Sequence, residues 1–133
     1  MFEFFQPITL NKANNLSPVT LAFVGDAVYS LYIRQKLVLA ADYTPATLQK
    51  MSSAEVSAHG QNELLHRIEG QFTEEEAAVF KRGRNAKKPS HSKHADLAEY
   101  NNSTGLEAVF GWLYLTGQNE RLISLLENVF ITR

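Results

Sequence analysis

The sequence predicts an all-α protein, a single domain of six or seven helices over residues 1–133, and three observations support this. The chain is 44% hydrophobic and 11% aromatic, which is enough to bury one continuous core. Helix-capping signatures recur along it, each followed by apolar residues at helical spacing. Almost no segment has the alternating pattern of a β-strand. We therefore expect helices packed around one core.

The first two helix starts are marked by a hydroxyl residue followed by proline. Ser17 with Pro18 places an N-cap ahead of a helix that extends to about Leu39. Thr44 with Pro45 repeats this signature.

Two capping boxes of the pattern S/T-x-x-E predict two further helices, and a glycine follows each helix where it should stop. The boxes are Ser52 with Glu55 and Thr73 with Glu76, the helices cover about 53–69 and 74–82, and the glycines are Gly70 and Gly83.

The last two helices are predicted by apolar spacing. Asp96 with Glu99 resembles a cap, and it opens a helix to about Thr116 that Gly117 ends. The final helix covers about Asn119–Ile131, with its apolar residues on one side. These residues are Leu122, Leu125, Leu126, Val129 and Phe130.

Composition excludes several classes of protein. The chain has no cysteine, which rules out disulfides and thiolate metal sites and permits a reducing compartment. No apolar run approaches the ~20 residues that span a bilayer. The start, MFEFFQPITL, lacks the basic residues and cleavage site of a signal peptide. We expect a soluble, cytoplasmic protein with no membrane partner.

Basic charge is concentrated in one segment, KRGRNAKKPSHSK, which is expected to be a loop because of Pro89 and its serines. The chain has a net charge of −1, yet six of its 13 basic residues lie in this segment, which contains no acid. Such segregation indicates a local anionic partner, although a solvated loop would have the same composition. The basic residues are Lys81, Arg82, Arg84, Lys87, Lys88 and Lys93.

A single carboxylate, Asp26, follows Gly25 inside the apolar run LAFVGDAVYSLYIR. Glycine in a helix interior costs about 1 kcal/mol relative to alanine, and a buried carboxylate costs more unless it is compensated. The helix is apolar nearly all round, which places it in the centre of the domain, where much of the surroundings of Asp26 cannot solvate a charge. A residue that breaks local rules in this way indicates function.

The later helix repeats the arrangement in GLEAVFGWLYL, where Glu107 is the only acid of the central part and Gly111 lies nearby. Small residues allow close approach, so Gly25 and Gly111 would let the two helices cross with Asp26 and Glu107 facing a common point. Two such carboxylates repel each other unless they share a proton or hold a cation, and Mg²⁺ suits them. In the alternative interpretation, each acid bonds to a neighbouring backbone or hydroxyl group.

These segments resemble a known family. LAFVGDAVYS is similar to the ribonuclease III signature helix, close to L-E-F-L-G-D-A-V, and LEAVFGWLYL resembles the later helix with its invariant glutamate. The order of helices and the run FKRGRNAK resemble the short branch called Mini-ribonuclease III. The resemblance covers about 17–130 and implies a ribonuclease III-like catalytic domain.

The resemblance implies a magnesium-dependent endoribonuclease that cuts double-stranded RNA and leaves 5′-phosphates. Asp26 and Glu107 match metal-binding catalytic residues, where the metal would activate water and stabilise the leaving 3′ oxygen. Phe23 matches a phenylalanine that packs into the partner subunit of a homodimer. The short branch is associated with processing of the large-subunit (23S) ribosomal RNA precursor, and this is the expected substrate.

Two departures from larger relatives affect these expectations. Those relatives have acids where this chain has Ala22 and Thr104, which leaves one or two metal ions per site equally open. They also append an RNA-binding domain, whereas this sequence stops at Arg133. RNA contacts are therefore expected from Lys81, Arg82, Arg84, Lys87 and Lys88, with strong salt dependence. A non-catalytic, double-stranded-RNA-binding or scaffold dimer is the alternative function.

Overall fold

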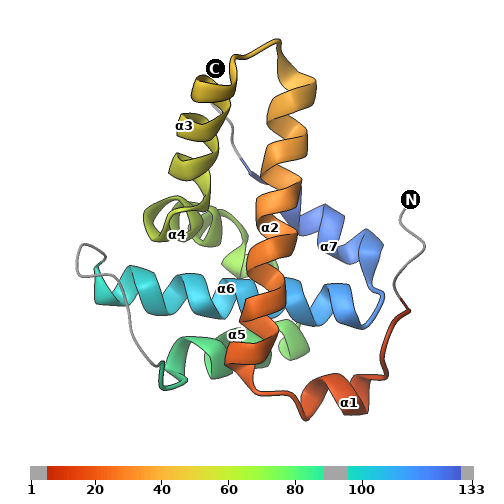
Figure 1. Cartoon of the computed structure of the whole chain (residues 1–133). Coiled ribbons are helices and arrows are strands. Elements are labelled where there is room, and N and C mark those ends of the chain that lie inside the picture. Colours follow the sequence, from red (N-terminus) through yellow and green to blue (C-terminus); the bar gives the residue numbers. More distant parts are fainter. Residues whose placement is uncertain (1–5, 89–95, 130–133) are drawn as a thin grey trace.

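The computed structural model describes residues 6–88 and 96–129, which contain seven α-helices, one 3₁₀ turn and no strand (Figure 1). The all-α prediction is confirmed. The helices are α1 Leu10–Asn14, α2 Pro18–Ala40, α3 Pro45–Val56, α4 Ala58–Ile68, α5 Glu74–Asn85, α6 Leu97–Leu115 and α7 Asn119–Leu126, with the turn η1 Glu69–Gln71 after α4. None of the described helices is long and apolar enough to cross a membrane.

Four of the predicted caps are present. The side chains of Ser17, Thr44 and Asp96 each accept a hydrogen bond from a backbone N–H in the first turn of α2, α3 and α6. Thr73 and Glu76 form a complete capping box at α5, with each side chain bonded to the other's backbone N–H. These starts follow directly from local sequence.

The predicted helix over 53–69 is wrong at its beginning. Ser52 lies inside α3, where it is buried and its hydroxyl donates to the carbonyl of Gln49 at 3.2 Å. The cap is Ser57, which ends α3 and accepts from the N–H of Gly60 at the start of α4. An S-x-x-E pattern also fits a helix interior, because a serine there can bond back to its own helix.

Gly83 does not end its helix, which continues to Asn85. A Cβ atom at Gly83 would lie 2.9 Å from the Cα of Gly105, so this glycine allows α5 and α6 to pack closely. Lys81 and Arg82 lie on the helix, as the predicted range 74–82 implied, and Arg84 also lies on it and not in the predicted loop.

The two ends of the chain also differ from expectation. The short helix α1, capped by Thr9, was not predicted. Helix α7 ends at Leu126, whereas the sequence predicted a longer element, and Phe130 and Ile131 lie outside the described residues. Gly117 does follow α6, and its φ of 74° is one that favours glycine.

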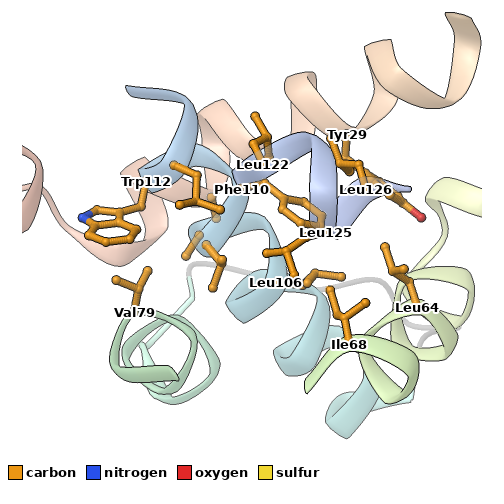
Figure 2. Close-up of a cluster of buried hydrophobic side chains, with 14 of the residues drawn as sticks. Tyr29, Leu64, Ile68, Val79, Leu106, Phe110, Trp112, Leu122, Leu125 and Leu126 are labelled. Atoms are coloured by element: carbon orange, nitrogen blue, oxygen red, sulfur yellow. The ribbon is translucent and has the colours of Figure 1, made fainter. Parts of the chain in front are cut away.

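Helix α6 forms the centre of the fold and packs against α2, α4, α5 and α7. In Figure 1, α2 crosses α6 near the middle of the molecule. Ten residues of α6 are buried. Their neighbours in the core include Leu64 and Ile68 of α4 and Val79 of α5, and the ring of Tyr29 stacks on Phe110 at 5.6 Å (Figure 2). The core thus surrounds the helix that carries Glu107.

The expectation that α2 is buried on all sides is wrong. Tyr29, Ile33 and Leu37 on one side are fully buried, but several large apolar residues on the other side face solvent. These are Phe23, 81% exposed, Leu31, 51%, Val38, 60%, and Leu39, 75%.

Candidate functional site

Helices α2 and α6 cross at the two glycines that the sequence singled out. A Cβ atom at Gly25 would overlap the carbonyl of Glu107 and approach the N–H nitrogen of Gly111 at 2.8 Å. A Cβ atom at Gly111 would overlap the carbonyl of Leu21. No side chain fits at either position, so the backbones are in direct contact.

This contact brings Asp26 and Glu107 together. Burial is the largest influence on Glu107 and raises its pKa; a hydrogen bond from Gln61 lowers the pKa, while the charge of Asp26 and a hydrogen bond with it raise it, to about 8 overall. Glu107 is partly buried in α6, whereas Asp26 is exposed at the mouth of the site. The sequence predicted that Asp26 would be poorly solvated, but in the structure Glu107 is the poorly solvated acid.

A third residue, Gln61 of α4, belongs to the site and was missed by sequence reasoning. Its Nε2 donates to Oε2 of Glu107 and to the carbonyl of Val56, both at 3.0 Å. The side chain is 2% exposed, and its Oε1 is buried without a hydrogen-bond partner. No signal in the sequence marks it, because a glutamine in a short amphipathic helix is usually a surface residue.

Tyr29 follows Asp26 by three residues in α2 and is fully buried. Its hydroxyl donates to the carbonyl of Glu55 at 3.2 Å. Burial, followed by the charges of Glu55 and Glu107, raises the Tyr29 pKa, and Arg67 only partly opposes them. The phenol therefore stays a neutral donor at physiological pH.

The donor set suits one hard divalent cation. Within residues 6–88 and 96–129, no group of three or more His, Cys, Asp and Glu side chains could hold a metal, so the pair has no third such ligand. The two positions where the motif resemblance would place further acids hold a buried Ala22 and a buried Thr104, whose hydroxyl donates to the carbonyl of Tyr100 at 3.2 Å. Mg²⁺ uses one or two carboxylates and completes its octahedron with water, and the unpaired Oε1 of Gln61 could accept from such water.

The basic residues of α5 and the segment after it are not equivalent. Lys81, Arg82 and Lys87 are exposed. Arg84 is partly buried, with its guanidinium 5.7 Å from the ring centroid of Phe80. Lys88 donates from Nζ to the carbonyls of Gly83 and Arg84, at 2.8 and 2.9 Å, and so caps the C-terminus of α5. Lys93 lies outside the described residues.

Phe23 lies on the solvent side of α2, three residues before Asp26. The side of α2 next to α3 lines an apolar groove of about 220 Å³, and its lining includes Leu37, Val38 and Leu48. An exposed phenylalanine and an apolar groove are features of surfaces that bind a partner.

Comparison with known proteins gives one consistent result. The protein-family model of the ribonuclease III domain matches residues 19–118 of this chain. The Mini-ribonuclease 3 of Thermoanaerobacter sp. (strain X514) is 44% identical over 120 residues, covering 90% of this chain and 84% of that protein. The Mini-ribonuclease 3 of Staphylococcus aureus is 42% identical over 121 residues, covering 90% of each.

A solved structure agrees with these relatives. The crystal structure of protein FN1578 from Fusobacterium nucleatum superposes with a TM-score of 0.77 at 33% sequence identity. The match covers 85% of this chain and 90% of that one.

Proposed function

Because this chain belongs to the ribonuclease III family and is an endoribonuclease acting on double-stranded RNA, we propose that Asp26 and Glu107 form its catalytic centre and that Mg²⁺ is its cofactor. The family resemblance noted from the two sequence motifs is confirmed. We further propose that the protein works in the cytoplasm and that its substrate is the 23S ribosomal RNA precursor. The association of the Mini-ribonuclease III branch with the processing of this precursor supports the choice of substrate.

The observation that supports this proposal is the meeting of two carboxylates, of which Glu107 has no basic side chain as a partner among the described residues. Glu107 receives one neutral amide donor, from Gln61, and faces Asp26. Its pKa is raised because burial and the neighbouring acid both penalise its charge. Such a pair attracts a divalent cation, which would replace the shared proton.

Each residue then has a defined task. Asp26, at the exposed mouth, and Glu107, held by Gln61, would provide the carboxylate oxygens for one Mg²⁺. When bound, Mg²⁺ supplies an activated water, neutralises the scissile phosphate and stabilises the leaving oxygen. The glycine crossing fixes the distance between the two acids, since neither helix can move without separating backbones that are in contact.

We assign RNA binding to Lys81, Arg82, Arg84, Lys87 and Lys88. Lys81, Arg82 and Lys87 present their charges to solvent, and contacts to phosphate and 2′-hydroxyl groups require no base-specific geometry. Three of these residues also have structural contacts, so neutralising them should lower stability as well as affinity. They are Arg82, whose Nη2 donates to the carbonyl of Leu16 at 3.2 Å, Arg84 and Lys88.

The charge assignment is tested by Lys81→Gln and Lys87→Gln, combined in one protein. The slope of log affinity against log salt should become shallower by about one per lost phosphate contact. Lys50→Gln is the matched control, because α3 and α5 lie at opposite ends of the molecule (Figure 1). An unchanged slope in the double variant would make these lysines ordinary surface residues.

For the homodimer, we propose that Phe23 of each subunit inserts into the partner's groove between α2 and α3. The 81% exposure of Phe23 and the apolar lining of the groove support this. Phe23→Asp should give a monomer in sedimentation velocity, while Ile123→Asp, at a 47% exposed position on α7, should leave the dimer intact. If Phe23→Asp still formed a dimer with an unchanged dissociation constant, Phe23 would not be part of the interface.

The catalytic assignment is tested by cleavage of a long RNA duplex. Asp26→Asn and Glu107→Gln should each lower the cleavage rate by more than about 100-fold, since both remove a direct metal ligand. Asp42→Asn, an exposed acid just beyond α2, should cut at the normal rate. Binding without cutting by the unmodified protein, with Mg²⁺ or with chelator, would instead favour the scaffold function.

A further inference from the structure

Gln61 is a buried amide whose two N–H groups are both used. Its Nε2 donates to Oε2 of Glu107 and to the carbonyl of Val56, each at 3.0 Å. The residue is 2% exposed, so both bonds are made in the interior of the protein. Gln61 therefore ties the Glu107 carboxylate to the junction of α3 and α4.

The orientation of the amide is set by these partners. The backbone carbonyl of Val56 can only accept a hydrogen bond, and so can a carboxyl oxygen of Glu107 that carries no proton. If the amide were turned over, Oε1 would face both acceptors and two bonds would become repulsions. The nitrogen must therefore face Glu107, and the oxygen is left on the other corner of the same planar group.

That oxygen is not satisfied by the protein. Oε1 of Gln61 is one of two buried side-chain atoms in the described part of the chain without a hydrogen-bond partner. Buried acceptors in native proteins are nearly always paired, and unpaired ones in functional sites often have a partner that arrives with a ligand. The oxygen and nitrogen of an amide share one carbon, so this unpaired acceptor lies beside the Glu107 contact.

The neighbouring residue shows what a purely structural amide looks like. Asn62 also links α4 to α6, and its Oδ1 accepts from Nδ2 of Asn102 at 2.9 Å. Its acceptor is used within the protein, and it does not contact the acids. Gln61 and Asn62 thus make similar helix-to-helix links, but only Gln61 keeps an acceptor open next to the carboxylate pair.

We propose that Gln61 is a positioning residue of the metal site: its Nε2 holds the Glu107 carboxylate in place, and its Oε1 accepts a hydrogen bond from a water bound to the divalent cation. This inference rests on the proposed function, because it requires that Asp26 and Glu107 bind the cation. It adds an outer contact from α4 to a site whose direct ligands come from α2 and α6.

The test replaces the amide without changing its size. In Gln61→Met, Mn²⁺ alone is titrated into RNA-free protein and followed by electron paramagnetic resonance. We expect Mn²⁺ affinity to fall about 10-fold, the loss typical for residues that orient metal ligands. With duplex RNA, kcat at limiting Mg²⁺ should fall while KM for RNA stays within about twofold, because RNA contacts are elsewhere.

Asn62→Leu is the matched control, since it removes an amide link between the same two helices at the next position. It should lower the melting temperature as Gln61→Met does but leave Mn²⁺ affinity unchanged. Equal loss of Mn²⁺ affinity in both variants, or unchanged affinity in Gln61→Met, would overturn the proposal. If Gln61→Met binds normally while Asp26→Asn is inactive, the positioning role alone fails and the catalytic assignment stands.

Gln61→Glu provides a second test that does not depend on how methionine is accommodated. This variant keeps an acceptor oxygen but replaces the donor that faces Glu107 with a second carboxylate oxygen. We expect a lower melting temperature in chelator and a larger rise on adding Mn²⁺ than in the unmodified protein, because the cation then offsets three acids. The hydrogen bond from Gln61 to Glu107 would not be needed if the variant matched the unmodified protein in two measurements. These are the melting temperature in chelator and the cleavage rate.

Discussion

Two carboxylates packed inside this protein, Glu76 and Glu107, are stabilised in opposite ways. Glu76 is 2% exposed, and its two oxygens accept from Nε and Nη2 of Arg121, both at 2.8 Å. Burial by itself raises the Glu76 pKa, but hydrogen bonds from Arg121 and from the Thr73 backbone outweigh it, and the pKa is lowered. The cation that Glu76 needs is part of the chain.

Glu107 has no such cation among the residues that the structure describes. It has an amide, Gln61, and a second acid, Asp26, and its pKa is raised to about 8. The fold places an arginine beside Glu76, whereas the partners of Glu107 among the described residues are a neutral amide and a second acid. The difference supports the proposal that the Glu76 pair is structural and that the Glu107 pair binds a cation from solution.

The largest effect should come from separating the two acids at the crossing. Gly111→Ala forces a Cβ atom onto the carbonyl of Leu21, so we expect a loss of more than about 3 kcal/mol in the free energy of unfolding. Gly70→Ala is the control, because no atom lies within 4 Å of a Cβ there, and it should change stability by less than about 1 kcal/mol. Urea unfolding measures both, and similar values would refute the close crossing.

Removing the internal cation should come next. Arg121→Met leaves Glu76 buried and unpaired, which should cost about 2–3 kcal/mol of unfolding free energy, near the low end for a buried pair because Arg121 is partly exposed. The protein that remains folded should cleave RNA normally. A loss of activity at unchanged stability would mean that Glu76 is not simply structural.

The two acids should also respond to pH with opposite signs. Glu107 has a raised pKa, so its contribution to stability is complete below about pH 4.5 and is lost as pH rises to about 8. Glu107→Gln should remove this loss, on the order of 1–3 kcal/mol, when unfolding is measured in chelator at pH 5 and pH 8. Glu76, with a lowered pKa, instead loses its contribution as pH falls. An identical pH dependence in Glu107→Gln and the unmodified protein would contradict a buried Glu107 with a raised pKa.

The smallest effect is expected where a partly exposed acid is paired with an exposed histidine. Glu99 lies 2.9 Å from Nδ1 of His59, a side chain that is 69% exposed. Exposed pairs contribute little because water already solvates both charges. His59→Ala should therefore shift the melting temperature by no more than about 1 °C. A larger shift would mean that ion pairing contributes strongly to stability even where the paired side chains are not buried.

The sequence predicted the features that depend on local chemistry. Ser17, Thr44, Thr73 and Asp96 cap helices because their side chains bond to backbone groups only three residues away. The meeting of Asp26 and Glu107 was also predictable, because a glycine close to an acid in each of two apolar helices permits a crossing at which the two acids face each other.

What the sequence could not predict depends on contacts between distant elements. Gly83 is a residue type that often follows the end of a helix, but here its lack of a side chain allows close contact with Gly105 of α6. Gln61 becomes part of the site only because α4 packs on α6, 46 residues further along the chain. The exposed apolar side of α2 was not predicted for a similar reason, since the composition of a helix that is apolar nearly all round does not show which side packs on the core.

The central claim is that Asp26 and Glu107 together bind a divalent cation, and calorimetric titration of Mg²⁺ into the RNA-free protein tests it most directly. The unmodified protein should bind Mg²⁺ and release protons near pH 7, since the cation replaces the proton held on Glu107. Asp26→Asn and Glu107→Gln should each weaken binding by at least about 10-fold and reduce the proton release. Equal Mg²⁺ affinity in all three proteins would contradict the account.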